Sequence, residues 1–392
     1  MTGVGSRYEV KEKLGISHVL EHMAFKGTTK RPKARDIATL VEGVGGEWNA
    51  FTDKEVTAYW IKLGGENLDL ALDVLSDILI NPILDPKELT KEKGVVLEEI
   101  KMRHDTPRIH IEDIFAEQVL GDQPLGWDTA GGKKSLDSIN RGDVKSFIDQ
   151  YYRSENMVIA LAGKIPADIE ERVEGYFSKL AKGKTPGYLA AVMGQSAPSV
   201  KIDTRSTEQA HLALGMEGVS RSDQDYYPLQ LLINILGEGM SSRLWESIRE
   251  EKGLAYTVRA GSESYHDAGF IMIYAGVATN KAESTVEAIL EELRKVASSK
   301  VSLAELKKAK ENLKGRLKLS LEETDHLAVT FGLRELLENR VLTVDDIITL
   351  IDRVTEADVL RVSTRLFRGE KLNLSVIGPY DDRDRFLKLL KL

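Results

Sequence analysis

Residues 47–79 read EWNAFTDKEVTAYWIKLGGENLDLALDVLSDIL, and this stretch predicts the architecture of the chain. Residues 47–52 and 56–61 have the composition of short strands. They are followed by leucines at the spacing of an amphipathic helix, namely Leu68, Leu72, Leu75 and Leu79. Two neighbouring strands followed by a helix are typical of an antiparallel pair covered on one side. We therefore expect an α+β domain.

The same order of elements recurs in the second half of the chain. Strand patterns at 255–260 and 270–274 precede a helical pattern at 281–293. Each half also closes on a strand-like run that begins with Asn and ends with Gly, at 156–163 and at 373–378. This repeat predicts two tandem similar domains, each with an antiparallel-rich sheet covered by helices. The expected limits are residues 1–182 for the first domain, 183–204 for a linker and the start of the second, and 205–392 for the rest.

The repeat also predicts a shortage of strands in the first domain. The second half opens with two strand-like runs, at 200–203 and at 210–216. The first half opens directly at residues 3–7, which match only the end of the second of these runs. We therefore expect the first sheet to lack a leading strand and part of the next. Either the chain is shortened at its N-terminus or this sheet is short.

Composition restricts the classes of function. The formal net charge is −8, which argues against a nucleic-acid partner. The absence of cysteine excludes disulfides, iron–sulfur clusters and thiolate metal sites. No apolar run is long enough for a membrane span, so no membrane association is expected. We expect a cytoplasmic protein, while a signal peptide upstream of residue 1 stays open.

Residues 18–22 read His-Val-Leu-Glu-His and carry the strongest chemical signal. On a helix, His18, Glu21 and His22 project from one face, because they lie at i, i+3 and i+4. Two imidazoles one turn apart can bind a single metal ion, and the carboxylate between them can take a proton from a water molecule. The pattern is the inverted form of the zinc-protease motif, although a motif this short also arises by chance.

A zinc site for catalysis needs a third protein ligand. A helix is expected from Pro86 to Arg103, where Glu92 and Glu99 lie two turns apart on one face. This helix offers one carboxylate for a metal and another beside it. The equivalent helix of the second half has Arg316 in the place of Glu99, and no histidine motif precedes it. We therefore expect only the first domain to bind a metal.

Five segments together resemble the insulinase/pitrilysin family of zinc metallopeptidases, and most of all the mitochondrial processing peptidase β-subunit and its bacterial relatives. The segments are residues 15–28, 49–52, 92–100, 239–244 and 248–256. The resemblance implies that His18, His22 and Glu99 bind Zn²⁺. It implies that Glu21 is the general base on a zinc-bound water, and that Glu92 supports the ligands.

The resemblance also implies how a peptide substrate is held. Asn49, Ala50 and Phe51 match the family's strand beside the metal, where an extended peptide adds as a further strand. Arg249 and Tyr256 match a pair that reaches the active site from a C-terminal domain and stabilises the substrate carbonyl. Without the resemblance, the sequence favours a surface salt bridge for Arg249 and a core position for Tyr256.

Together these features predict a zinc-dependent endopeptidase that hydrolyses unfolded peptides or presequence-like segments. We expect a homodimer in which Arg249 and Tyr256 serve the partner's zinc site. Three alternatives stay open: a non-catalytic scaffold subunit, an enzyme that needs a different partner subunit, and a peptide-binding module. A ligand set of two histidines and a glutamate also does not exclude cobalt or manganese.

Overall fold

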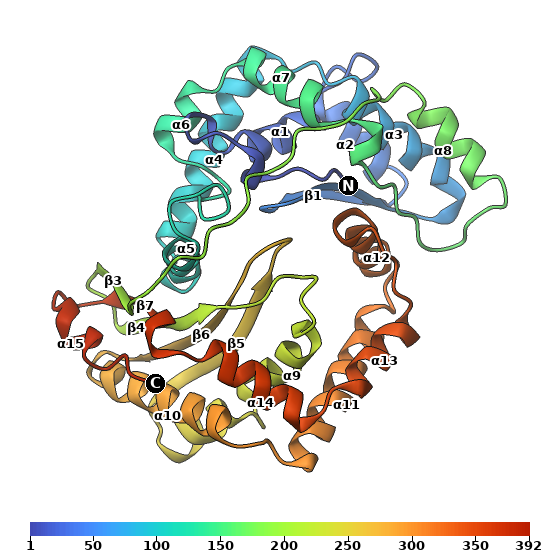
Figure 1. The fold of residues 1–392 in the computed structure, drawn as a ribbon. Coiled ribbons are helices and arrows are strands. Elements are labelled where there is room, and N and C mark those ends of the chain that lie inside the picture. Colours follow the sequence, from blue (N-terminus) through green and yellow to red (C-terminus); the bar gives the residue numbers. More distant parts are fainter. The chain divides into compact units, whose positions relative to one another are not determined.

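The computed structural model describes residues 1–392, and the chain separates into two compact units (Figure 1). The first unit consists of Met1–Met102, Trp127–Leu189 and Ser320–Val341, and the second of Arg103–Gly126, Ala190–Leu319 and Leu342–Leu392. Both units combine a sheet with helices, which confirms the α+β class. The step from Leu189 to Ala190 falls inside the expected linker. Helices α5 (Pro107–Leu120) and α12 (Thr324–Glu338), however, each belong to the unit built mainly from the other half.

The first unit has a two-stranded antiparallel sheet, formed by β1 (Glu47–Thr52) and β2 (Thr57–Lys62) at the predicted positions. Its buried core lies between this sheet and the surrounding helices. The helices are α1 (Ile16–Ala24), α2 (Ala34–Glu42), α3 (Leu68–Ile80), α4 (Pro86–His104), α6 (Lys133–Ser138), α7 (Arg141–Tyr151) and α8 (Ile169–Phe177).

The predicted strand at 156–163 is not formed as a strand. Only Met157 makes a β-bridge, to Thr2, and Thr2 also bridges to Thr57 of β2. A strand needs a neighbour along its whole length to satisfy its backbone groups. Residues 1–3 supply such a neighbour for the start of this run alone, so its remainder stays irregular. The first sheet accordingly has two strands, β1 and β2.

The second unit has a five-stranded sheet in the order β3-β7-β4-β6-β5. β3 (Ser199–Thr204) runs parallel to β7 (Asn373–Gly378), whereas β4 (Gln209–Glu217), β6 (Gly269–Ala278) and β5 (Ala255–Ser264) continue the sheet antiparallel. One face packs on the larger core and the other on α5. The remaining helices are α9 (Tyr226–Gly237), α10 (Ala282–Ser298), α11 (Leu303–Ser320), α13 (Val344–Arg353), α14 (Glu356–Leu366) and α15 (Arg383–Leu387).

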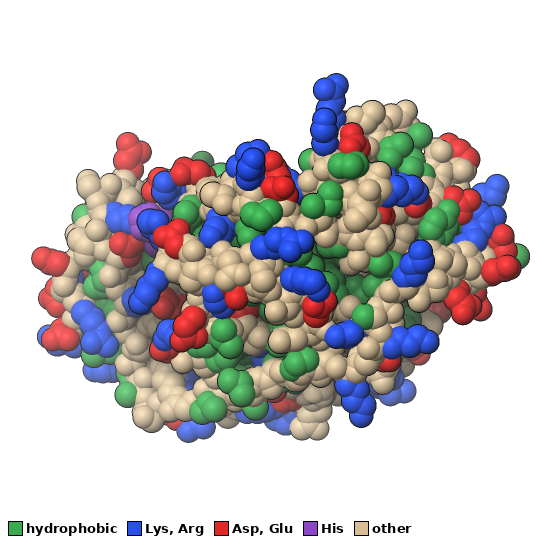
Figure 2. Space-filling model, turned by 90° about the horizontal axis from the view of Figure 1, so that it is seen from above, with side chains coloured by type: hydrophobic (Ala, Val, Ile, Leu, Met, Phe, Trp, Pro, Cys, Tyr) green, Lys and Arg blue, Asp and Glu red, His purple; other side chains and the backbone are tan.

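The surface carries charges of both signs. Figure 2 shows basic and acidic side chains interspersed over the visible face, with hydrophobic side chains between them. None of the helices combines the length and the apolar content that crossing a bilayer requires.

Candidate functional site

Helix α1 begins at a glycine that the local geometry requires. Gly15 precedes the helix with a φ of 90°, in the left-handed region. A Cβ at this position would lie 2.5 Å from the carbonyl oxygen of Ala130. Only glycine fits here without strain. The predicted apolar stripe of the helix is buried, and it consists of Ile16, Val19, Leu20 and Met23.

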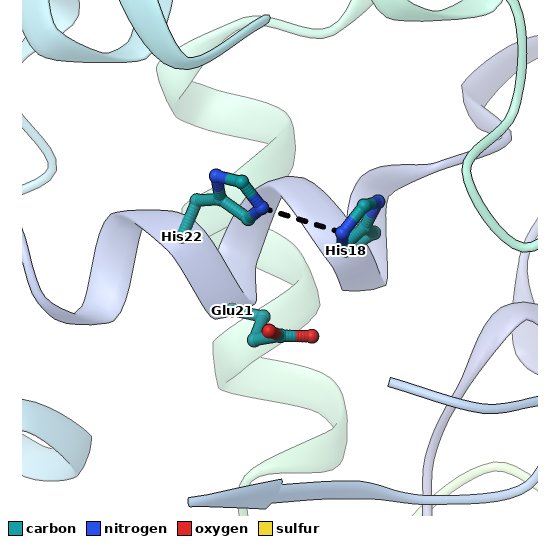
Figure 3. Close-up of side chains that lie close together, drawn as sticks. All are labelled: His18, Glu21 and His22. Atoms are coloured by element: carbon teal, nitrogen blue, oxygen red, sulfur yellow. Dashed lines mark hydrogen bonds between the residues drawn. The ribbon is translucent and has the colours of Figure 1, made fainter. Parts of the chain in front are cut away.

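The opposite face of α1 carries His18, Glu21 and His22, whose ligand atoms all lie within 4.8 Å of one another (Figure 3). The Nε2 atoms of the two histidines are 3.3 Å apart. From α4, Oε2 of Glu99 lies 3.5 Å from Nε2 of His18 and 3.7 Å from Nε2 of His22. In a tetrahedral zinc site with bonds of about 2.0–2.1 Å, ligand atoms lie about 3.3–3.4 Å apart. This donor set therefore fits a zinc ion.

Glu21 lies beside this donor set and is positioned by β1. Its Oε2 accepts a hydrogen bond of 2.5 Å from Oγ1 of Thr52. Burial raises the pKa of the Glu21 carboxyl, and the nearby Glu99 acts in the same direction, whereas Thr52 and His22 lower it. A carboxyl whose pKa is raised is a better proton acceptor, as a general base must be.

Glu92 lies behind His22, on the same helix as Glu99. Its Oε2 is 3.1 Å from Nδ1 of His22, and its Oε1 is 2.8 Å from Nζ of Lys26. The Glu92 side chain is only 7% exposed. A carboxylate on Nδ1 leaves Nε2 of His22 as the free nitrogen and fixes the orientation of the ring. Glu92 therefore contacts His22 through Nδ1, the ring nitrogen that is not directed at His18 and Glu99.

The N-terminus of α1 is anchored by a buried carboxylate. Glu9 accepts hydrogen bonds from the backbone nitrogens of Gly15, at 2.7 Å, and Ser17, at 2.8 Å. These two donors have no partner inside the helix. Burial raises the pKa of Glu9 to about 7 despite the two bonds. Glu9 thus fixes the position of the first turn, which carries His18.

The residues predicted to hold a peptide lie on β1. Ala50 packs against the core on the α1 side of the strand, and Thr52 points the same way because strand side chains alternate. Asn49 is exposed on the other face, and Phe51 shares that face. β1 pairs with β2 alone, so its second edge is open to a further strand.

Arg249 and Tyr256 belong to the second unit. The Arg249 guanidinium lies 3.9 Å from the ring centre of Trp245 and 5.9 Å from that of Tyr256. Tyr256 is 74% exposed, so it is not the core tyrosine that the alternative reading allowed. The pair thus lies at the surface of this unit, with Tyr256 exposed and Arg249 partly exposed.

The second unit offers no equivalent of the metal donors. α9 takes the place of the histidine helix and has no histidine, and Arg316 of α11 forms an ion pair of 2.6 Å with Glu238. The donors that converge on α1 have no counterpart elsewhere in the chain.

Three residues of the site received no role from the sequence. Thr52 and Lys26 lie in segments that resemble the family, residues 49–52 and 15–28. No spacing rule, however, connects Thr52 with Glu21 or Lys26 with Glu92. Glu9 lies outside the usual capping positions of α1, because it reaches the helix through a folded loop. The alternation of β1, which places Thr52 on the same side as Ala50, is the one signal that could have identified Thr52.

Comparison with known proteins agrees with this arrangement. A sequence model of the insulinase family, peptidase family M16, matches residues 1–133, and one described as the peptidase M16 inactive domain matches residues 138–313. The chain is 39% identical to an uncharacterized zinc protease of Bacillus subtilis, YmxG, over 96% of this chain and 91% of that protein. It is 36% identical to an uncharacterized zinc protease of Streptomyces coelicolor, over 97% of this chain and 84% of the other.

Solved structures share the fold. The crystal structure of a protease from Helicobacter pylori matches with a TM-score of 0.89 and 26% identity, over 96% of this chain and 92% of that one. A peptidase M16 inactive domain from Pseudomonas fluorescens matches with a TM-score of 0.89 and 21% identity, over 97% and 92%. On the family match and these relatives, the chain belongs to the insulinase family of peptidases, peptidase family M16.

Proposed function

We propose that this peptidase is a zinc-dependent endopeptidase whose metal ligands are His18, His22 and Glu99. The observation that carries the proposal is the convergence of three donor atoms from two helices, separated by 3.3, 3.5 and 3.7 Å. Exposed acidic clusters are common without a metal, but two imidazoles and a carboxylate at these separations match the preference of zinc. The naming of the relatives as zinc proteases supports the same metal.

Glu21 is proposed as the general base. A zinc ion held here would polarise the scissile carbonyl and acidify a water molecule. The carboxylate of Glu21, positioned by the hydroxyl of Thr52, accepts the proton of the attacking water and passes it to the leaving amine. Glu92 keeps the imidazole of His22 in the orientation that presents Nε2 to the metal.

The open edge of β1 supports extended peptides as the substrate class. A peptide that pairs with this edge is held by main-chain hydrogen bonds, which select an extended conformation more than a particular side chain. Most segments inside a folded domain already have their backbone groups paired, so they are poorer partners for this edge. We therefore propose unfolded peptides or presequence-like segments as substrates, with Asn49, Ala50 and Phe51 beside them.

We further propose that Arg249 and Tyr256 stabilise the substrate carbonyl, and that they do so across a homodimer. The exposure of Tyr256 and its contact with Arg249 support a role at a surface that meets another molecule. In a homodimer, cleavage should decline on dilution below the dissociation constant. A monomer that keeps full activity at high dilution would contradict this assignment.

The experiment that tests the function is cleavage of an unstructured basic peptide by the zinc-loaded protein. We expect a chelator to abolish cleavage and added zinc to restore it, while His22→Ala loses both zinc and cleavage. Glu98→Gln is the matched control, because Glu98 lies on α4 with its side chain 71% exposed. Cleavage that persists in His22→Ala without bound metal would refute the proposal.

A second candidate is a subunit that acts only with a different partner. The match of residues 138–313 to a domain described as inactive favours this alternative for the second half of the chain. It predicts stoichiometric zinc binding and no cleavage by the isolated protein. The donor set and base of the first unit favour a self-sufficient enzyme.

A further inference from the structure

A π-helix carries Arg249 in the second unit. It spans Trp245–Glu251, and the backbone nitrogen that follows it, that of Lys252, donates to the carbonyl oxygen of Ser247 at 3.2 Å, five residues earlier. Turns of this i→i+5 type are rare, and they occur frequently at functional sites. The inner face of the helix is fixed, because Ile248 is fully buried in the core of the unit. The outward side chains of the helix therefore project from a well-anchored turn.

Tyr256 lies at a second local irregularity, a β-bulge at the start of β5. Ala255 pairs with Val277 of β6 and Thr257 pairs with the adjacent residue of β6, Gly276, so Tyr256 is the extra residue on its strand. Bulges occur next to active sites, where they change the direction of a side chain. This bulge therefore concerns the one residue of β5 to which a role in the site has been given.

Burial shows what the bulge achieves. Ala255 and Val258 both lie in the buried core, although residues three apart on a regular strand point to opposite faces. The extra residue lets both of them enter the core and leaves the Tyr256 ring at the surface, 74% exposed. Two irregular elements, the π-helix and the bulge, thus bring Arg249 and Tyr256 together.

The indole ring of Trp245 stacks on the guanidinium of Arg249. The guanidinium carbon lies 3.9 Å from the ring centre of Trp245 and 5.9 Å from that of Tyr256. Cation–π attraction acts within about 6 Å of a ring centre, and tryptophan gives the strongest interaction. The cation is therefore within reach of both rings and held mainly by Trp245.

Glu250 orients the ring more than it orients the cation. Its Oε1 accepts a hydrogen bond of 3.1 Å from Nε1 of Trp245, but lies 4.0 Å from Nε of Arg249. The Glu250 side chain is 62% exposed, and an ion pair that is both long and exposed contributes little. Trp245 is thus the group that orients the guanidinium, and Glu250 holds the indole.

Stacking leaves the donors of the guanidinium available. Arg249 contacts the two rings and approaches Glu250, but no hydrogen bond joins its guanidinium to another residue. A guanidinium has five N–H donors, and a carboxylate held in a bidentate pair would occupy two of them. A ring face restricts the rotamers of the arginine without occupying its donors. The side chain therefore loses less conformational freedom when it binds a further acceptor.

We propose that Trp245 is a positioning residue, which holds the Arg249 guanidinium beside Tyr256 with its N–H groups available to the substrate carbonyl. This inference rests on the proposed function, in which Arg249 and Tyr256 stabilise that carbonyl. Trp245 acts through Arg249 and not through its own contact with the substrate. Its removal therefore slows turnover only in a chain that still has Arg249.

The test is a double-mutant cycle on cleavage of an unstructured basic peptide, with Trp245→Leu and Arg249→Met made singly and together. We expect Trp245→Leu to lower kcat roughly 2- to 6-fold at unchanged zinc content, the equivalent of one partly exposed cation–π contact. Trp245→Phe keeps an aromatic face and should restore most of the rate. In the Arg249→Met chain, Trp245→Leu should have no further effect. Glu246→Gln, at an exposed position of the same helix, is the matched control.

The outcomes separate this inference from the proposed function. A slow Arg249→Met beside a Trp245→Leu at the wild-type rate would overturn the inference alone. Equal losses from Trp245→Leu with and without Arg249 would also overturn it, since they indicate a purely structural effect. Arg249→Met at the wild-type rate would instead remove the proposed role of Arg249, and the inference with it.

The nuclear magnetic resonance signal of the Arg249 Nε–H group gives a reading that needs no activity. An aromatic ring shifts the resonances of protons above its face, so Trp245→Leu should move this signal toward the position of an unstacked arginine. Trp245→Phe should keep part of the shift. A signal that is the same in the wild type and in Trp245→Leu would overturn the stacking, and the inference, even for a protein without turnover.

Discussion

The role of Glu92 leads to a prediction whose size follows from the structure. Glu92→Gln keeps the shape of the side chain and removes the charge that accepts from Nδ1 of His22 at 3.1 Å. The exposed fraction of the Glu92 side chain is 7%, so water does not restore the lost charge. The Gln side-chain oxygen still accepts from Nδ1, so the loss is the difference between a bond to a charged group, about 1.5–3 kcal/mol, and a neutral one, about 0.5–1.5 kcal/mol. At roughly 1–1.5 kcal/mol, the zinc dissociation constant should rise roughly 5- to 12-fold, at 1.4 kcal/mol per factor of ten.

The assay is competition for zinc between the protein and a chelating dye of known affinity. The thermal midpoint of the metal-free protein is measured in parallel, because an unfolded variant would lose zinc for another reason. Glu98→Gln makes the same chemical change on the same helix, but its partner Lys101 is exposed. It should leave the zinc affinity unchanged. A zinc affinity of Glu92→Gln within twofold of the wild type would refute the reasoning about His22.

Three further predictions concern the groups around the base and the helix. Thr52→Val should keep zinc but lower kcat roughly tenfold, because it loses a hydrogen bond of about 1.5 kcal/mol to the base. Thr52→Ser keeps the hydroxyl and should stay near the wild-type kcat. A Thr52→Val variant with the wild-type kcat would contradict the positioning role of Thr52. Between the ordinary value of 4.5 and about 7, folded Glu9 keeps a proton that the unfolded chain has released, so stability falls as pH rises through this range. Thermal unfolding of metal-free Glu9→Gln should show a flatter slope from pH 5 to 7, and an unchanged slope would exclude Glu9 as its source. Tyr256→Phe should lower kcat about 10²-fold with zinc affinity unaltered, as for loss of an oxyanion donor elsewhere; an unaltered kcat would remove Tyr256 from the mechanism.

Helices and strands whose apolar residues recur at a regular spacing were predictable from the sequence. The limits of β1 and α4 were predicted to within one residue. The alternating side chains of β1 and the proline at the first position of α4, Pro86, are both local signals in the sequence. The proximity of His18 and His22 was also predictable, since helical spacing places them one turn apart on α1. Their convergence with Glu99 depends on how α4 packs, which spacing alone does not give.

Other features depend on contacts between distant segments. The run at 156–163 has a strand-like sequence, yet it lacks a neighbour beyond residues 1–3 and does not form a strand. The membership of α5 and α12 in opposite units follows from the apolar faces they cover, not from their position in the chain. Glu9 reaches the start of α1 through tertiary folding, so no sequence pattern predicts that it accepts hydrogen bonds from the first turn of this helix.

The most direct test of the central claim is turnover of Glu21→Gln measured at the same zinc occupancy as the wild type. His18, His22 and Glu99 are untouched by this change, so the variant should bind one zinc ion per chain and cleave the peptide at least about 10²-fold more slowly, within the usual contribution of a general base. A variant that holds its zinc and cleaves at the wild-type rate would contradict the account.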